Sequence, residues 1–213
     1  MLTLPLVARK YRSPGNGPTV PTITMKKNLI PQVCAFLLFC LASCGGSSDS
    51  TSVDAAGKHN ENLLESTGKP EQAGWFVANM ASCNTLEAEL GRLASSKGND
   101  PRVKELGQLL LNHHTQLNTQ LKQIADLKNL ITPTSLSNDH QQIFNNILEK
   151  SGASFDQAYL EAIIKNHKDT IDEFQEMADE GEDTEIRNFS IRSLPTLQAH
   201  LTQAEALENA LKG

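Results

Sequence analysis

Apolar and polar residues alternate along most of the chain after residue 69 with the spacing of three and four that is typical of amphipathic helices. The pattern is interrupted at Lys97-Gly98-Asn99, at the stretch TPTSLS, at Gly152 and at Gly181. Four long helices and one short one are therefore predicted. They cover residues 70 to about 96, 101 to about 130, 138–150, 154–181 and 183–213. No stretch shows the sustained alternation of a strand, so the chain is predicted to be all-α.

Several helix ends carry recognisable signals. Asp100 is a favourable N-cap, and Pro101 is a favourable first helical residue. Ser154 and Gln157 have the spacing of a capping box at the start of the third long helix. Pro195 lies inside the last predicted helix and predicts either a kink or a broken first turn there.

Four long helices with short connections predict an antiparallel four-helix bundle, with the short helix placed before the third long one. Its core is expected at the apolar positions of each stripe. These are Phe76, Met80, Cys83, Leu90, Ala94, Leu110, Leu117, Leu121, Leu160, Ile164, Ile171, Phe174, Ala178, Leu197, Ala204, Leu207 and Leu211.

Each of the four apolar stripes is interrupted by one titratable side chain. The four residues are Glu87, His114, His167 and His200. At a rise of about 1.5 Å per residue, counted from the connecting turns, all four lie at a similar height near the middle of the bundle. We therefore expect them to converge in its interior.

A carboxylate and three imidazoles in one interior allow two interpretations. They suit a mononuclear site for a transition metal such as Zn, Fe, Cu or Mn. Alternatively, they hydrogen-bond to one another and fix the register of the bundle, which would also avoid the cost of an unpaired buried carboxylate. The sequence by itself favours the structural network. The metal site, with Glu87, His114, His167 and His200 as ligands, remains the alternative.

The N-terminal part of the chain has the features of an export signal. The apolar segment 29–43 is too short for a bilayer span, and MKKN precedes it. Its end, Leu41-Ala42-Ser43-Cys44, resembles the lipobox of bacterial lipoproteins, which predicts lipid attachment at Cys44. We expect residues 1–24 to be a mis-assigned extension, 25–43 a signal peptide, 44–69 a lipidated flexible tether and 70–213 the bundle domain.

Location and charge follow from this division. Gly45 rather than Asp follows the cysteine, so an outer-membrane anchor with the domain in the periplasm is expected, with the cell surface and inner membrane as alternatives.

Residues 1–43 hold five basic residues and no acidic one, so the remainder has 14 basic and 25 acidic residues, a net charge of −11. Such a polyanion is a poor candidate for nucleic-acid binding. Cys83 is the one cysteine expected in the folded part, which excludes an intramolecular disulfide there.

Several stretches of residues 75–211 resemble a known bacterial family, the domain of unknown function 4142. They are LEAELGRLA at 86–94, NHHTQLNTQL at 112–121, FDQAYLEAIIKNH at 155–167 and LPTLQAHL at 194–201. The resemblance implies a ferritin-like bundle in an exported or outer-membrane protein, without an established activity. It selects Glu87, His114, His167 and His200, and it favours His114 over His113. The family usually has Asp where this chain has His113, so a carboxylate that would orient the neighbouring histidine is missing or replaced.

Known catalytic motifs are missing from the sequence. It contains no Glu-x-x-His, so a di-iron centre is disfavoured and any metal is expected to be mononuclear. It also lacks His-Glu-x-x-His and Gly-x-Ser-x-Gly, and Phe155, Asp156 and Tyr159 are interpreted as a helix cap with packed aromatics. A binding module or a structural, stress-related module is therefore predicted, with a protein partner unspecified. The alternative is a metalloenzyme that acts on peroxide or superoxide.

Overall fold

The computed structural model describes residues 51–212, and within this range it contains six helices and no strand. The helices are α1 (Val53–Ser66), α2 (Gln72–Lys97), α3 (Pro101–Leu127), α4 (Asn138–Leu148), α5 (Gly152–Glu180) and α6 (Thr184–Lys212). The all-α prediction is confirmed. The predicted long helices agree with α2, α3, α5 and α6 to within a few residues, and the short helix agrees with α4.

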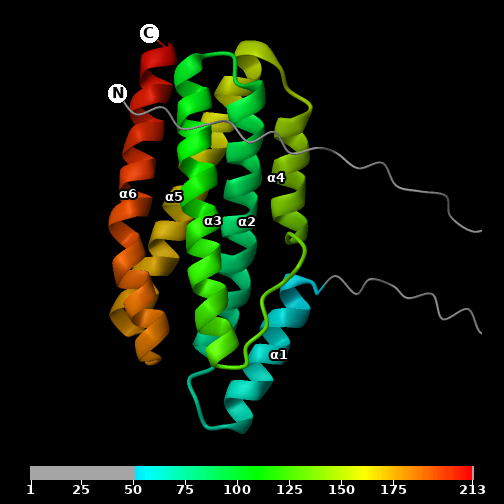
Figure 1. Cartoon of the computed structure of the whole chain (residues 1–213), viewed down its shortest axis with the longest axis vertical. Coiled ribbons are helices and arrows are strands. Elements are labelled where there is room, and N and C mark those ends of the chain that lie inside the picture. The colour runs from blue at the N-terminus through cyan, green and yellow to red at the C-terminus, as the bar shows by residue number, and fades with distance from the viewer. Residues whose placement is uncertain (1–50, 213) are drawn as a thin grey trace, which may run out of the picture. The chain divides into compact units, whose positions relative to one another are not determined.

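The long helices pack in a closed ring in which α2 contacts α3, α3 contacts α6, α6 contacts α5 and α5 contacts α2 (Figure 1). The helix α4 packs against α2 and α5, and α1 packs against α2. The buried apolar residues form two large clusters along the ring. One includes Phe76, Leu117, Phe174 and Leu197, and the other includes Leu90, Leu110, Ile163 and Ala204.

The register between α2 and α3 depends on two glycines at their crossing. A methyl group on Gly91 would stand 2.6 Å from the carbonyl oxygen of Gly107, and one on Gly107 would stand 2.7 Å from the amide nitrogen of Ser95. Only glycine allows the two backbones to approach this closely. Asn84 precedes Gly91 by two helical turns and His114 follows Gly107 by two, so the same register places these two side chains together.

The prediction of a flexible tether over residues 44–69 is wrong for residues 53–66, which form α1. Ser52 caps the helix by accepting a hydrogen bond from the amide of Ala55 at 3.1 Å. On α1, the buried Asn60 side chain donates to the carbonyls of Gly74 and Ile131 and accepts from the amide of Ile131. The polar composition of this segment hid the few positions that face α2.

Part of the predicted core on α5 and α6 is also wrong. On α5, Ile164, Ile171 and Ala178 are only partly buried and lie beside the core stripe. The buried positions are instead Ile163, Thr170 and Met177, one residue earlier in each case. His167 and Phe174 belong to either phase of the stripe, so the sequence pattern did not distinguish the two. Near the end of α6, Leu211 is 38% exposed.

One helix-end prediction needs correction, and another is narrowed to one of its two alternatives. The capping box is not formed, because α5 already begins at Gly152 with a φ of 58°. The hydroxyl of Ser154 donates to the carbonyl of Ser151, and the amide of Gln157 donates to Glu161. The helix α6 runs through Pro195 without a break, so a broken first turn is not what this proline marks.

The predictions of an extension over 1–24, a signal peptide over 25–43 and lipid on Cys44 lie outside the described residues. Within residues 51–212, none of the helices combines the length and the apolar character that crossing a bilayer requires.

Candidate metal centre

The four predicted site residues are all buried in the layer between the two apolar clusters. Glu87, His114, His167 and His200 are each 1% exposed. On α3, for example, His114 lies between Leu110 of one cluster and Leu117 of the other. Each of the four long helices therefore contributes one titratable group to the same polar layer, as the spacing predicted.

The three histidines form a nearly equilateral triangle. The ring centroids of His114 and His167 are 5.3 Å apart, those of His114 and His200 are 5.3 Å apart, and those of His167 and His200 are 5.4 Å apart. One ring nitrogen from each of the three lies within 4.8 Å of those of the others. The arrangement can present three nitrogen ligands to one point.

Hydrogen bonds to the protein fix one nitrogen on two of these rings. The Nδ1 atom of His167 is 3.0 Å from the carbonyl oxygen of Ile163, and Nδ1 of His114 is 3.0 Å from the side-chain oxygen of Asn84. Both partners are acceptors, so both Nδ1 atoms carry the proton. In the neutral form of each ring, Nε2 is left with a lone pair, and Nε2 of His114 has no hydrogen-bond partner among the described residues.

The third ring connects the triangle to a fourth histidine. The Nδ1 atom of His200 is 3.3 Å from Nε2 of His167, and its Nε2 atom is 2.7 Å from Nδ1 of His113. The His113 ring stacks on His200 with centroids 5.0 Å apart. His113 therefore contacts the site even though it lies outside the triangle.

Glu87 contacts only one corner of the triangle. Its Oε1 atom is 3.4 Å from Nδ1 of His167 and accepts a hydrogen bond of 2.6 Å from the amide of Asn166. Its Oε2 atom is buried and has no hydrogen-bond partner among the described residues. The carboxylate is not part of the group of three ligand atoms. As placed, Glu87 supports His167 from the side of Nδ1.

Burial sets the protonation of the histidines. It holds the pKa of His114 well below its ordinary value, and the neighbouring histidines add to this effect. Burial, with the charges of His167 and His113, lowers the pKa of His200 to about 3. Burial would lower the pKa of His167 as well, but the carboxylate of Glu87 and the hydrogen bonds outweigh it, and the pKa of His167 is raised. Two corners of the triangle are thus kept neutral, while the third holds a proton more readily.

Three supporting residues were not predicted from the sequence. They are Asn84, Asn166 and His113, which hydrogen-bond to His114, Glu87 and His200 respectively. The two asparagines offered a weak signal, since Asn84 lies three positions before Glu87 and Asn166 directly precedes His167. Amides beside buried charged groups are candidates for their hydrogen-bond partners.

Other candidate groups do not join the centre. The thiol of Cys83 is buried and contacts Thr170 and Asn166, and burial raises its pKa to about 12. The buried hydroxyl of Tyr159 has no hydrogen-bond partner among the described residues, and burial together with the charge of Glu87 raises its pKa. No described hydrogen bond links Tyr159 to the three histidines. The burial of the Cys83 thiol agrees with its predicted place in the core, and its raised pKa keeps it protonated and unreactive.

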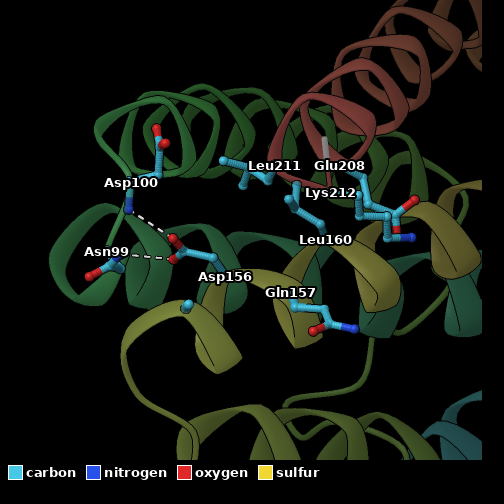
Figure 2. A pocket seen from close by; sticks show the side chains of 9 residues that line it. Asn99, Asp100, Asp156, Gln157, Leu160, Glu208, Leu211 and Lys212 are labelled. Carbon is cyan, nitrogen blue, oxygen red and sulfur yellow. Dashed lines mark hydrogen bonds and ion pairs between the residues drawn. The ribbon is translucent and has the colours of Figure 1, made fainter.

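A separate pocket of about 330 Å³ lies near the α2–α3 turn, the start of α5 and the end of α6 (Figure 2). At its wall, the buried carboxylate of Asp156 accepts hydrogen bonds of 2.8 Å from the backbone amides of Asn99 and Asp100. Both of its oxygens are used in holding this turn. The structural role predicted for Asp156 is supported, although it acts on a neighbouring turn and not on the end of its own helix.

Comparisons with known proteins agree with the fold. The chain is similar to the crystal structure of a DUF305 fragment from Deinococcus radiodurans, with a TM-score of 0.59 and 12% sequence identity. The alignment covers 65% of this chain and 96% of that one, and at this identity the likeness is one of fold. A comparison with curated proteins gives no match. The model of the family described as Domain of unknown function (DUF4142) matches residues 62–207, and the chain belongs to this family.

Proposed function

We propose that the helical domain binds a single transition-metal ion through His114, His167 and His200. The observation that carries the proposal is the separation of 3.3 Å between Nε2 of His167 and Nδ1 of His200. Two nitrogens at about 2.0–2.1 Å from one tetrahedral zinc are about 3.3–3.4 Å apart. The third corner, His114, supplies a buried nitrogen without a hydrogen-bond partner among the described residues.

The structural network is the competing interpretation, and the hydrogen bonds favour the metal over it. A network that only fixes the register should satisfy its own buried groups, because each unpaired one costs about 1–3 kcal/mol. Among the described residues, Nε2 of His114 and Oε2 of Glu87 lack a hydrogen-bond partner. A cation at the centre of the triangle would bind Nε2 of His114 and offset the negative charge of Glu87.

The ligand set also limits the choice of metal. Three imidazoles suit zinc, copper or iron, whereas manganese prefers oxygen ligands. Glu87 is better placed to support His167 through Nδ1 than to be a fourth ligand, an arrangement that is common around metal-bound histidines. The proposal therefore takes His114, His167 and His200 as ligands and Glu87 as their outer support. The proposed site is mononuclear, as in the sequence-based hypothesis, but it has three histidine ligands instead of three histidines and a glutamate.

We further propose that α2, α3, α5 and α6 are the antiparallel four-helix bundle of a ferritin-like fold. Their closed ring of contacts supports this assignment, as do the short connections between α2 and α3 and between α5 and α6. The centre would then lie between helices in the core of the bundle, where such folds commonly place metals.

The envelope location is proposed from the sequence of residues 25–45. Attachment of lipid to Cys44 would anchor the domain to the outer membrane from the periplasmic side. Because α1 begins at Val53, only the residues between Cys44 and Val53 are then available as a tether. Cys44→Ala is expected to abolish incorporation of labelled palmitate, and persistent labelling would contradict the anchor.

Metal binding is tested by the metal content of the purified protein and by titration with Zn²⁺. One equivalent of tightly bound metal is expected. Each of His114→Gln, His167→Gln and His200→Gln should weaken binding by more than about a hundredfold, beyond the loss typical of outer-shell partners. His59→Gln, which alters an exposed histidine on α1, is the matched control and should bind as wild type does. Absence of metal binding by the wild-type protein would return the site to the structural network.

Catalysis is a second candidate because three protein ligands leave one position open for a small molecule, as in catalytic zinc sites. Turnover of peroxide or superoxide by the metal-loaded protein would identify an enzyme. Binding of one equivalent without such turnover would favour a binding module.

A further inference from the structure

His113 contacts the centre through one of the proposed ligands, His200, and is not itself a corner of the triangle. It directly precedes His114 on α3 and is half-buried. Its Nδ1 atom lies 2.7 Å from Nε2 of His200, and the two rings are stacked with an interplanar angle of 21°. His113 thus holds one ring nitrogen of His200 while the other nitrogen faces His167.

A neutral imidazole carries one proton and can bind a metal only through the nitrogen without it. To present Nδ1 to the metal, His200 must carry its proton on Nε2, and that buried proton needs an acceptor. We propose that His113 is the positioning residue of the metal site. Its Nδ1 atom accepts the Nε2–H of His200, which fixes the ring and leaves Nδ1 of His200 free to bind. This inference rests on the proposed metal site.

The hydrogen bonds run in the opposite direction when the rings are neutral and no metal is bound. The carbonyl of Ile163 only accepts, so His167 carries its proton on Nδ1, and its Nε2 accepts from Nδ1–H of His200. The Nε2 atom of His200 then accepts from Nδ1–H of His113. In the metal-free protein, His200 therefore carries its proton on Nδ1, the nitrogen that must bind the metal. His113 carries its proton on Nδ1, the nitrogen that must accept from His200.

Metal binding reverses this chain by a balanced movement of protons. The proton on Nδ1 of His200 leaves to water. The proton on Nδ1 of His113 passes to Nε2 of His200, and Nε2 of His113 takes a proton from water. Each ring is neutral before and after. His113 is suited to this exchange because it lines a pocket of about 270 Å³ together with Gln116, Arg192 and Thr196.

Three variants of His113 separate positioning from packing. The oxygen of Asn or Asp can occupy the place of Nδ1 and accept the proton, whereas Leu fills the space without an acceptor. His113→Leu should weaken Zn²⁺ binding by about 10–100-fold, the loss typical of an outer-shell partner. His113→Asn should stay within about threefold of wild type, and His113→Asp should bind at least as tightly. His59→Leu is the control for removal of a histidine elsewhere.

A second measurement is independent of any variant. Nitrogen NMR of the wild-type protein at a pH where His167 is neutral should show His200 protonated on Nδ1 without metal and on Nε2 with Zn²⁺. Wild-type affinity in His113→Leu would overturn the role of His113 while leaving the metal site intact. Protonation of Nδ1 in the Zn²⁺ form would overturn both the role of His113 and the assignment of Nδ1 of His200 as a ligand atom. Failure of the wild-type protein to bind Zn²⁺ would overturn both the metal site and this inference.

Discussion

Nε2 of His167 lies 3.3 Å from Nδ1 of His200, although the two residues belong to different helices and are 33 positions apart. The carbonyl of Ile163 fixes the first ring and His113 holds the second. The close approach is therefore built into the surrounding structure. It supports the proposed centre more strongly than the presence of three histidines does.

Metal affinity should depend on pH through His167. Burial opposes its protonation, but Glu87 outweighs burial and raises the pKa, so a proton competes with the metal for Nε2. Zn²⁺ affinity is expected to fall by about tenfold per pH unit once the pH drops below this raised pKa. In Glu87→Gln the pKa of His167 is lower, so the decline should begin at a lower pH. Zn²⁺ titrations between about pH 5.5 and 8 measure both profiles. Coincident profiles would contradict the role assigned to Glu87.

The metal-free protein should lose stability in acid. Burial lowers the pKa of His114, and it lowers that of His200 to about 3 from an ordinary value of 6.5. Below about pH 6.5 the unfolded chain therefore binds protons at these two histidines, whereas in the folded chain the two rings stay neutral. The contribution of these two histidines to the free energy of unfolding is present above about pH 6.5 and is lost as the pH falls towards about 3. Its slope is up to about 1.4 kcal/mol per pH unit for each group.

His167 acts in the opposite sense, because its pKa is raised on folding. Its contribution is present below about pH 6.5 and is lost as the pH rises through the raised value, so it only partly offsets the other two. Urea unfolding of wild type and His200→Gln across this range tests the balance. The free energy of unfolding of His200→Gln should fall less steeply in acid than that of wild type. His59→Gln is the control and should behave as wild type does. Equal slopes in wild type and His200→Gln would show that His200 is not buried in its neutral form.

The Gly91–Gly107 crossing should control both stability and metal affinity. Gly91→Ala places a methyl group against the backbone of α3 and is expected to destabilise the fold by about 1–3 kcal/mol. By pushing the helices apart it should also displace His114 and weaken Zn²⁺ binding. Ser96→Ala, at an exposed position of α2, is the control. Wild-type stability in Gly91→Ala, measured by urea unfolding, would disprove the close approach.

The helix α1 should behave as part of the folded domain. Asn60→Ala removes three hydrogen bonds, one buried and two part-buried, between α1, α2 and the segment after α3, and is expected to cost about 3 kcal/mol. Asn62→Ala, at an exposed position of the same helix, should cost less than about 0.5 kcal/mol. Urea unfolding measures both. Rapid proteolysis within residues 53–66 of the native wild-type protein would instead support the flexible tether.

The sequence pattern was sufficient for the features that depend on helical periodicity. Glu87, His114, His167 and His200 were found because each replaces an apolar residue in a stripe of spacing three and four. The same rule failed on α5, where a shift of one residue, from Ile164 to Ile163, fits the spacing equally well. Periodicity alone does not determine the rotation of a helix when its two phases share residues.

Other features depended on contacts that no local pattern encodes. The helix α1 has few apolar residues and is held by Asn60, whose partners include a residue 71 positions away. The capping residue Ser154 was misassigned because Gly152 starts α5 earlier. The role of Glu87 also needed coordinates, since spacing placed it in the same layer but did not show which nitrogen of His167 it faces.

The most direct test of the metal site is an anomalous difference map from crystals of the protein grown with Zn²⁺. We expect one peak inside the ring of helices, at about 2.0–2.1 Å from a nitrogen of each of His114, His167 and His200. A map with no peak among these three rings, or with zinc bound only at surface carboxylates, would contradict the proposed metal site.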